Sequence, residues 1–281
     1  MTGVTSRSPP TVTHVIPGGA GVNAVTSLDD HVYLVRSLKK EVEIYDAATL
    51  TLQRRLPVLG ISCSATGIAA CSRSKCLYLS DWENSRIHRV DLATDAMNTW
   101  PVAKQPNGLT VNEGHNVMVT FLDYKKLQEY TTDGRLVREI RLPAGLGRPW
   151  HAIQLSTGDY VVSHFETRGV VSVVGVDGQL LRSYGPSSSS DIGPMRLPTS
   201  LAVTKHGDIL VADFSNHRIL AINSSLTRAQ VFPLPADVGL EQPCTLYLDG
   251  TRTRDRLYIG EYAGKERVIV LNNPRYIKFC W

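Results

Sequence analysis

Aromatic and basic side chains recur together along the chain, in positions from which they could bind another molecule. In several repeating units an aromatic residue follows the second apolar strand, and basic residues come in or near the next loop. Aromatic faces stack on nucleic-acid bases while cations follow the phosphates, so this mixture suits single-stranded RNA. A protein partner is the competing hypothesis. The predicted contact residues are Lys39, Lys40, Trp82, Lys104, Tyr124, Lys125, Lys126, Arg148, Trp150, Phe165, Arg168, Arg196, Phe214, His217, Tyr262 and Lys265.

The same residues also have a simpler structural explanation. An aromatic residue repeated at one position commonly packs between neighbouring units, and scattered lysines commonly only solvate a rim. Phe121 competes with Tyr124 for the aromatic position of the third unit. The sequence therefore locates a candidate surface and leaves its ligand open.

Acidic residues and histidines provide candidate metal ligands, namely Asp81, His151, His164, Asp213 and Glu261. A metal site needs three or four such groups from different parts of the chain to converge. The two histidines belong to one repeating unit, and core packing or a hydrogen bond to a neighbouring unit explains His151 better than metal ligation. No P-loop, dinucleotide-binding fingerprint or nucleophile elbow is present. We therefore predict no catalytic residue, no metal and no cofactor.

Two acidic residues stand five positions before an arginine, a spacing that spans a tight loop. The pairs are Asp81 with Arg86 and Asp213 with Arg218. Charge-assisted hydrogen bonds within each pair would fix the turn without any substrate.

The composition is that of an ordinary globular protein, with 281 residues, 42% hydrophobic, 20% charged and a net charge of +4. No apolar run reaches the roughly 18 residues that cross a bilayer, and the first residues lack the apolar core of a signal peptide. We expect a cytoplasmic monomer without membrane contact. Five cysteines are too few and too scattered for a disulfide framework. Cys71 and Cys76 bracket a predicted hairpin turn, where they could form a local disulfide, contribute to a metal site or simply fill the core.

The elements that must position these residues are six repeats of one pattern, a turn followed by short alternating strands. Small residues head the first strand of each unit and are spaced by about 41 to 48 residues, a period typical of propeller blades of four strands. Six blades in a ring bury every apolar face against a neighbour. The sequence thus predicts an all-β, six-bladed β-propeller. The heading residues are Ala24, Gly67, Gly108, Ala152, Ser200 and Thr245.

The whole chain after a disordered segment at 1–10 is expected to form one domain. The last unit provides only three strands, so the alternating segment 11–16 is predicted to close the ring as its outer strand, with the tail after Pro274 as the competing closing strand. A serine-rich insertion is expected at 187–194. The predicted blades cover 20–58, 63–103, 104–145, 148–185, 196–236 and 240–273.

The segment VADFSNHRIL in the fifth unit matches the motif for which NHL repeats are named, and SDWENSRIHRV in the second unit is similar. Over about residues 11–273 the chain resembles the propeller at the C-terminus of TRIM-NHL proteins, although the sequence does not contain their RING, B-box and coiled coil. The first, third and fourth units depart from the motif, with Arg36, Phe121 and His164 where Asp is expected.

The resemblance implies a non-catalytic module that binds a protein or single-stranded RNA on one loop face. The alternative is a propeller enzyme of the lactonase or amidating-lyase kind with a metal in its central channel. Neither ligand pattern of those enzymes is recognisable here.

Overall fold

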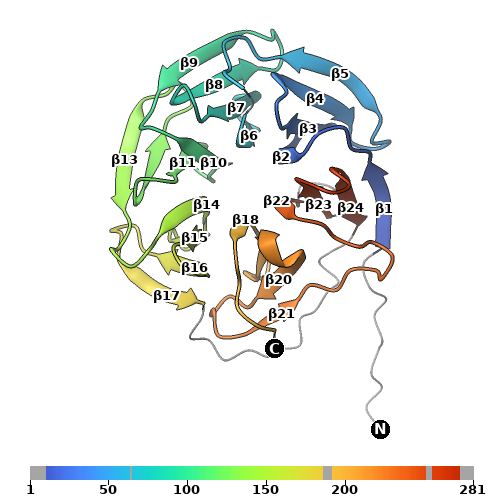
Figure 1. Cartoon of the computed structure of the whole chain (residues 1–281). Coiled ribbons are helices and arrows are strands. Elements are labelled where there is room, and N and C mark those ends of the chain that lie inside the picture. Colours follow the sequence, from blue (N-terminus) through green and yellow to red (C-terminus); the bar gives the residue numbers. More distant parts are fainter. Residues whose placement is uncertain (1–10, 64, 186–191, 251–254, 273–281) are drawn as a thin grey trace.

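Six four-stranded antiparallel sheets form a closed ring in the computed structural model (Figure 1). The structure describes residues 11–63, 65–185, 192–250 and 255–272. The predicted disordered segment at 1–10, most of the predicted insertion at 187–194 and the tail after Pro274 lie outside these ranges. The six-bladed propeller predicted from the repeat period is confirmed.

Blades 1 to 5 are each one meander, blade 6 takes its outer strand from the N-terminus, and the strand that begins each meander lies innermost in the ring (Figure 1). Blades 1 to 3 consist of β2 (Val22–Leu28), β3 (His31–Arg36), β4 (Glu41–Asp46) and β5 (Leu52–Pro57); β6 (Ile68–Cys71), β7 (Cys76–Asp81), β8 (Arg86–Asp91) and β9 (Met97–Pro101); β10 (Pro106–Val111), β11 (Val117–Phe121), β12 (Lys126–Tyr130) and β13 (Leu136–Arg141).

Blades 4 to 6 repeat this arrangement, and blade 5 adds a short 3-10 helix, η1 (Phe214–Asn216), after its second strand. Their strands are β14 (Arg148–Gln154), β15 (Tyr160–Phe165), β16 (Gly169–Val174) and β17 (Leu180–Tyr184); β18 (Pro198–Val203), β19 (Ile209–Asp213), β20 (Arg218–Ile222) and β21 (Ala229–Val231); β22 (Pro243–Asp249), β23 (Arg256–Glu261), β24 (Val268–Asn272) and β1 (Thr11–Ile16).

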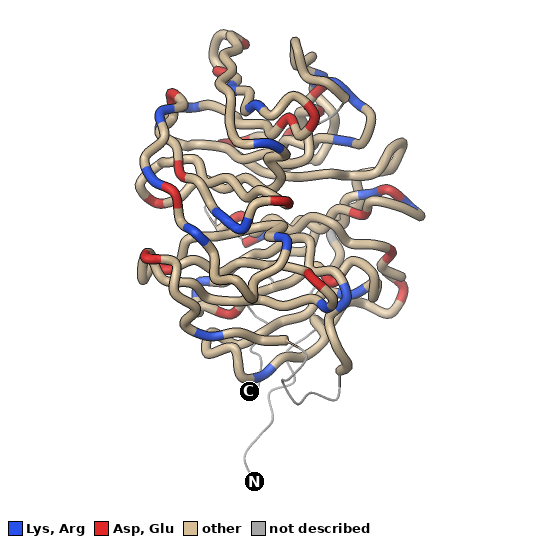
Figure 2. The backbone as a smooth tube through the Cα atoms, turned by 60° about the vertical axis from the view of Figure 1, so that its left-hand side comes forward, with Lys and Arg blue, Asp and Glu red and all other residues tan. Residues whose placement is uncertain are grey.

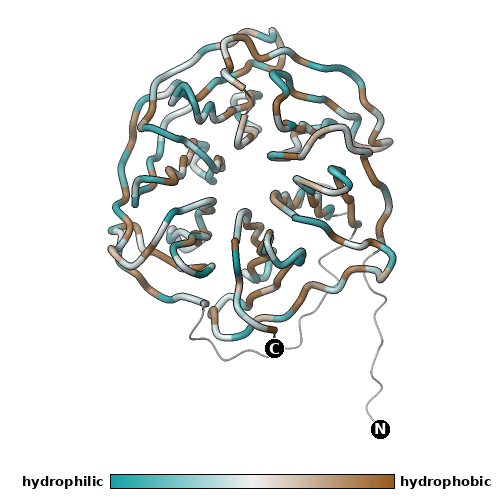
Figure 3. Tube along the Cα trace, in the orientation of Figure 1, coloured by the Kyte–Doolittle hydropathy of each residue, from teal (hydrophilic) through white to brown (hydrophobic). Residues whose placement is uncertain are grey.

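The hydrophobic core is divided among the interfaces between blades. Six core clusters lie in the described part of the chain, and each draws its residues from two neighbouring blades. Hydrophobic stretches accordingly recur inside every blade while turns are mostly hydrophilic (Figure 3). Because a single blade cannot bury both of its faces, the ring must close for the core to form.

The N-terminal strand closes the ring, as predicted. β1 pairs antiparallel with β24, and Ile16 at its end is fully buried. Arg36 secures this closure from blade 1, because its guanidinium donates to the backbone oxygens of Pro17, Ala20 and Glu266 at 3.0 Å. The Arg36 side chain also pairs with buried Glu43 at 2.8 Å.

The innermost strands share one irregularity that fixes their common register. In five of them the pairing with the second strand shifts one or two residues after the strand begins, as between Pro198 and Ser200. In blade 4 the residue equivalent to Ser200 is His151, since it follows the shifted position. The predicted heading residue Ala152 is therefore wrong by one, and the other five are in register.

The cysteines described by the structure are free thiols. Cys71 and Cys76 are direct partners across β6 and β7, and both are buried in the core between blades 2 and 3. Of the alternatives predicted for them, core packing is the one that the structure displays.

No helix in the described ranges is long and apolar enough to cross a membrane.

Candidate binding face and central channel

One end of the ring carries both the loops between second and third strands and the segments that join successive blades. We call this end the upper face. Its loops comprise residues 37–40, 82–85, 122–125, 166–168, 214–217 and 262–267, and its joining segments include 58–63, 102–105, 142–147, 194–197 and 232–242.

The sixteen predicted contact residues lie in these loops and segments or at the adjoining strand ends. Trp82, Tyr124 and Tyr262 are 36% to 43% exposed, whereas Phe165 and Phe214 are half-buried. The Phe214 and Tyr262 rings lie next to each other, with centroids 6.2 Å apart. Phe121 is fully buried, so Tyr124 is the exposed aromatic residue of blade 3.

Exposed large hydrophobic side chains are distributed unequally over the described molecule. Five belong to the upper face, and they include all the exposed aromatic rings: Leu38, Leu59, Trp82, Tyr124 and Tyr262. Seven lie on the outermost strands of the blades. Among the described residues, only Val176, in a turn between third and fourth strands, lies on the opposite face. Aromatic residues are enriched at protein interfaces, so this asymmetry marks the upper face as the candidate binding surface.

Many of the predicted basic residues already have partners within the chain. Lys126 pairs with Glu139 at 2.8 Å, and looser pairs join Lys125 to Glu166 and Arg148 to Asp123 at 3.8 and 3.9 Å. Among the described residues, no ion pair is formed by Lys39, Lys40, Lys104, Arg168 or Arg196. Lys and Arg positions are interspersed with Asp and Glu positions along the backbone drawn in Figure 2.

Two predicted contact residues stabilise the loops themselves. His217 Nδ1 accepts a hydrogen bond from the Gln242 backbone N–H at 3.2 Å, and Lys265 donates to the Gly239 carbonyl at 3.4 Å. The Lys126 ammonium group also lies over the Tyr124 ring, 5.6 Å from its centroid. One face of the Tyr124 ring is thus covered by a cation of the same blade.

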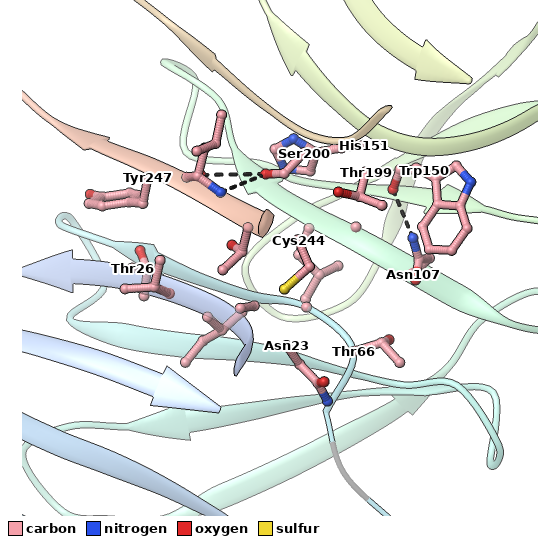
Figure 4. A pocket seen from close by; sticks show the side chains of 18 of the residues that line it. Asn23, Thr26, Thr66, Asn107, Trp150, His151, Thr199, Ser200, Cys244 and Tyr247 are labelled. Carbon is pink, nitrogen blue, oxygen red and sulfur yellow. Dashed lines mark hydrogen bonds between the residues drawn. The ribbon is translucent and has the colours of Figure 1, made fainter. Parts of the chain in front are cut away.

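A central channel opens at the upper face and has a volume of about 800 Å³. The innermost strands of all six blades line it, and Leu38, Phe214 and Tyr262 lie at its upper end. Trp150, predicted as a contact residue, forms part of the channel wall (Figure 4).

Hydrogen bonds from each blade to the next form a belt around the channel. In five blades the irregular residue of the innermost strand donates to a backbone oxygen of the following blade. The donors and acceptors are Asn23 and Ala65, Thr66 and Pro106, Asn107 and Trp150, Thr199 and Pro243, and Cys244 and Val22. Trp150 occupies the sixth position, and its buried indole N–H has no partner within the described structure.

His151 joins three blades. Its Nδ1 accepts a hydrogen bond from the backbone N–H of Leu201 in blade 5 at 3.2 Å. Burial lowers the pKa of His151 to about 4, although a hydrogen bond to the Leu109 backbone in blade 3 favours the charged form. A neutral ring held in this way is an inter-blade support, as the sequence favoured over a metal ligand.

The other candidate metal ligands are held inside their own blades. Glu261 pairs with Arg267 and Asp213 with Arg218, each at 2.8 Å. His164 Nε2 lies 2.8 Å from Ser172 Oγ, and burial lowers the His164 pKa to about 4. No group of three or more His, Cys, Asp and Glu side chains that could hold a metal ion occurs in the described ranges.

The predicted Asp213–Arg218 pair is therefore confirmed, but the predicted Asp81–Arg86 pair is wrong. Buried His88 approaches Asp81 at 3.1 Å, and Ser62 donates to the same carboxylate at 2.6 Å. Arg86 remains at the surface beside Thr99. Burial alone would raise the Asp81 pKa, but hydrogen bonds from Ser62, Asn84 and His88 outweigh it and lower the pKa.

The sequence analysis named a central channel only as the metal site of the alternative enzyme, and it missed the exposed Leu38 and Leu59. One signal for the belt was present, because the residue before the heading position is Asn, Thr or Cys in five units. Recognising its role required the ring, since each donor reaches a different blade.

The family model of the NHL repeat matches residues 195–222. No curated protein matches the sequence. Similar solved structures include a protein of unknown function from Bacteroides caccae, with 18% identity, a TM-score of 0.63 and coverage of 92% of this chain and 84% of that one.

A catalytically inactive virginiamycin B lyase from Staphylococcus aureus, solved with quinupristin, has 12% identity and a TM-score of 0.68, covering 90% of this chain and 81% of that one. Hydrazine synthase from Kuenenia stuttgartiensis has 13% identity and a TM-score of 0.66, covering 96% and 99%. At these identities the likeness shows the fold alone. Together with the matched repeat, it supports the assignment of the chain as a six-bladed propeller of NHL type.

Proposed function

We propose that this propeller is a non-catalytic interaction module that binds a protein partner on its upper face. The resemblance to TRIM-NHL propellers implies a module of this kind. The observation that carries this proposal is the gathering of all the exposed aromatic rings of the described chain at that face. Exposed Leu38 lies at the channel mouth, and exposed Leu59 lies on the same face in the segment that joins blades 1 and 2. Aromatic anchors surrounded by polar groups are typical of binding hot spots.

The charges of the upper face favour a protein over RNA. An RNA site needs cations that are available to phosphates, and the affinity then falls steeply with salt. Lys125, Lys126 and Arg148 face acidic partners of the same chain, and five predicted basic residues form no ion pair among the described residues, namely Lys39, Lys40, Lys104, Arg168 and Arg196. The Tyr124 ring, which a nucleobase would need as a stacking surface, already contacts Lys126.

A catalytic role has less support from the described residues. The acidic side chains that follow the second strands are engaged by Arg267, Arg218 and His88, and His151 bonds to the backbone. These contacts are structural ones within and between blades. The lyase among the similar structures shares the fold at an identity too low to transfer its activity.

The proposal is tested by panning a displayed library of random 12-residue peptides on the immobilised protein and measuring the affinity of each enriched peptide at low and moderate salt. We expect enriched peptides with apolar residues and only a modest salt dependence. A fluorescent RNA of random sequence is titrated in parallel. Failure to enrich peptides, together with RNA binding that weakens by orders of magnitude as salt rises, would replace the protein partner with RNA.

A further inference from the structure

The wall of the central channel is uncharged. Among the described residues that line it there is no Asp, Glu, Lys or Arg. His151 is neutral near pH 7, because its pKa lies at about 4. A charged ligand in this channel would lose its water without gaining a counter-charge, which is costly in a protein interior.

The side-chain donors of the wall are largely committed to the belt. Asn23, Thr66 and Asn107 donate to the next blade at 2.8 to 3.2 Å. Ser200 exchanges hydrogen bonds with the Leu246 backbone, and Thr110 donates to the Ala152 carbonyl. These bonds leave mainly methyl groups, aromatic rings and backbone at the channel surface.

The remaining polar groups of the wall are neutral, and they include backbone amides and the Trp150 indole N–H, which is unpartnered within the described structure. Each innermost strand is an edge strand that pairs on one side only, and its other edge faces the ring centre (Figure 1). Unpaired N–H and C=O groups of an edge strand can bond to neutral donors and acceptors. The channel therefore combines an apolar wall with a few neutral hydrogen-bonding positions.

The size and entrance of the channel fit a small molecule. Its volume of about 800 Å³ is within the usual range of ligand pockets, roughly 300 to 1,000 Å³. Leu38 and the neighbouring rings of Phe214 and Tyr262 provide an apolar entrance.

We propose that the central channel is a binding site for one neutral small molecule with a largely apolar body and few uncharged hydrogen-bonding groups. The argument depends on the channel wall and holds whether or not the upper face binds a protein.

Two dyes with the same skeleton test the charge requirement. N-phenyl-1-naphthylamine is neutral, and 1-anilinonaphthalene-8-sulfonate carries one sulfonate. Fluorescence titration of the full chain should show that the neutral dye binds at least tenfold more tightly, and native mass spectrometry should give one neutral dye per chain. Equal affinities, tighter binding of the anion or several neutral dyes per chain would overturn the proposal.

Two substitutions of Thr199 test the location. Among the belt hydrogen bonds with an oxygen or nitrogen donor, the one from Thr199 is the longest, at 3.5 Å. Its loss should therefore disturb the ring least. Thr199→Lys introduces a cation and should weaken the neutral dye and strengthen the anionic one, each at least fivefold. Thr199→Val keeps the wall neutral and should preserve the wild-type preference. An unchanged preference in folded Thr199→Lys would place the dye elsewhere.

Trp82→Ala separates this site from the proposed function. Trp82 lies on the upper face but does not line the channel. Its removal should weaken peptide binding and leave dye binding unchanged. Loss of the neutral dye in Trp82→Ala would contradict the channel site and assign the dye to the exposed face. Because the wild-type dye comparison needs no variant, it remains decisive if a substituted chain fails to fold.

Discussion

At the scale of single residues, one position at or near the end of the second strand, opposite the residue before the register shift, shows how one structural role is performed by different chemistry. Asp213 and Glu261 pair with arginines, while Arg36 reverses the charges and pairs with Glu43. Phe121 and His164 occupy the same position without an ion pair. All of these side chains are buried. A buried polar side chain at this position therefore needs a hydrogen-bonding or ionic partner, whereas Phe121 has no polar group and needs none.

His164→Phe, which introduces the residue found in blade 3, should reduce the pH dependence of stability. The folded-state pKa of His164 is about 4, below the value of about 6.5 expected in the unfolded chain. The neutral ring therefore contributes fully above pH 6.5, and its contribution is lost as the pH falls toward 4. Urea denaturation measures the free energy of unfolding between pH 7 and 4.5. Below about pH 6.5, this free energy should fall by about 1.4 kcal/mol per pH unit less in the variant than in the wild type. Parallel curves would refute this.

Gly108→Ala should destabilise the ring by about 1–3 kcal/mol through overpacking. A Cβ at Gly108 would lie 2.5 Å from the Trp150 carbonyl oxygen and 2.9 Å from His151 Cδ2 in the next blade. Gly145→Ala is the matched control, since a Cβ there meets nothing within 4 Å. Thermal unfolding of both variants decides, and equal melting temperatures would show that the two blades can separate to accommodate the methyl group.

The residue-scale predictions that succeeded concerned local spacing. The Asp213–Arg218 pair follows from the turn alone. The Asp81–Arg86 pair has the same spacing, but His88 competes for the carboxylate from within the sheet. In blade 4 the position equivalent to Ser200 is held by His151 in place of a small residue, so a search for small residues selected the neighbouring Ala152.

At the scale of elements, ring closure depends on one short strand far from its partner in the sequence. β1 completes blade 6, and Ile16 packs in the cluster shared by blades 6 and 1. Arg36 then holds the segment after β1 against the last loop of blade 6. The alternating pattern of residues 11–16 and the missing fourth strand of the last unit were sufficient to predict this closure.

Ile16→Ala should cost about 2–5 kcal/mol, because it leaves a cavity where the ring closes. Val15→Ala, on the adjacent and exposed side of the same strand, should cost well under 1 kcal/mol. Chemical denaturation of the two single variants measures the difference. Similar small losses for both would indicate that β1 contributes little to the folded ring.

At the scale of the whole molecule, the sides of the blades form the core, and one end of the ring provides the candidate binding surface. The sides form six separate core clusters, and the end that we call the upper face gathers the exposed aromatic rings. The repeat period predicted this ring and the face on which the loops meet. The repeat period could not predict the uncharged channel or the ion pairs of the basic side chains, since both depend on which side chains meet in the folded ring.

The central claim is that the upper face, and not another part of the ring, binds a protein partner. The most direct measurement is the dissociation constant of a selected peptide for Trp82→Ala, Tyr262→Ala and the opposite-face control Val176→Ala. The two upper-face variants should bind at least tenfold more weakly, corresponding to about 1.4 kcal/mol, while Val176→Ala changes affinity less than twofold. Equal effects of all three variants, or a loss confined to Val176→Ala, would contradict the assignment of this face.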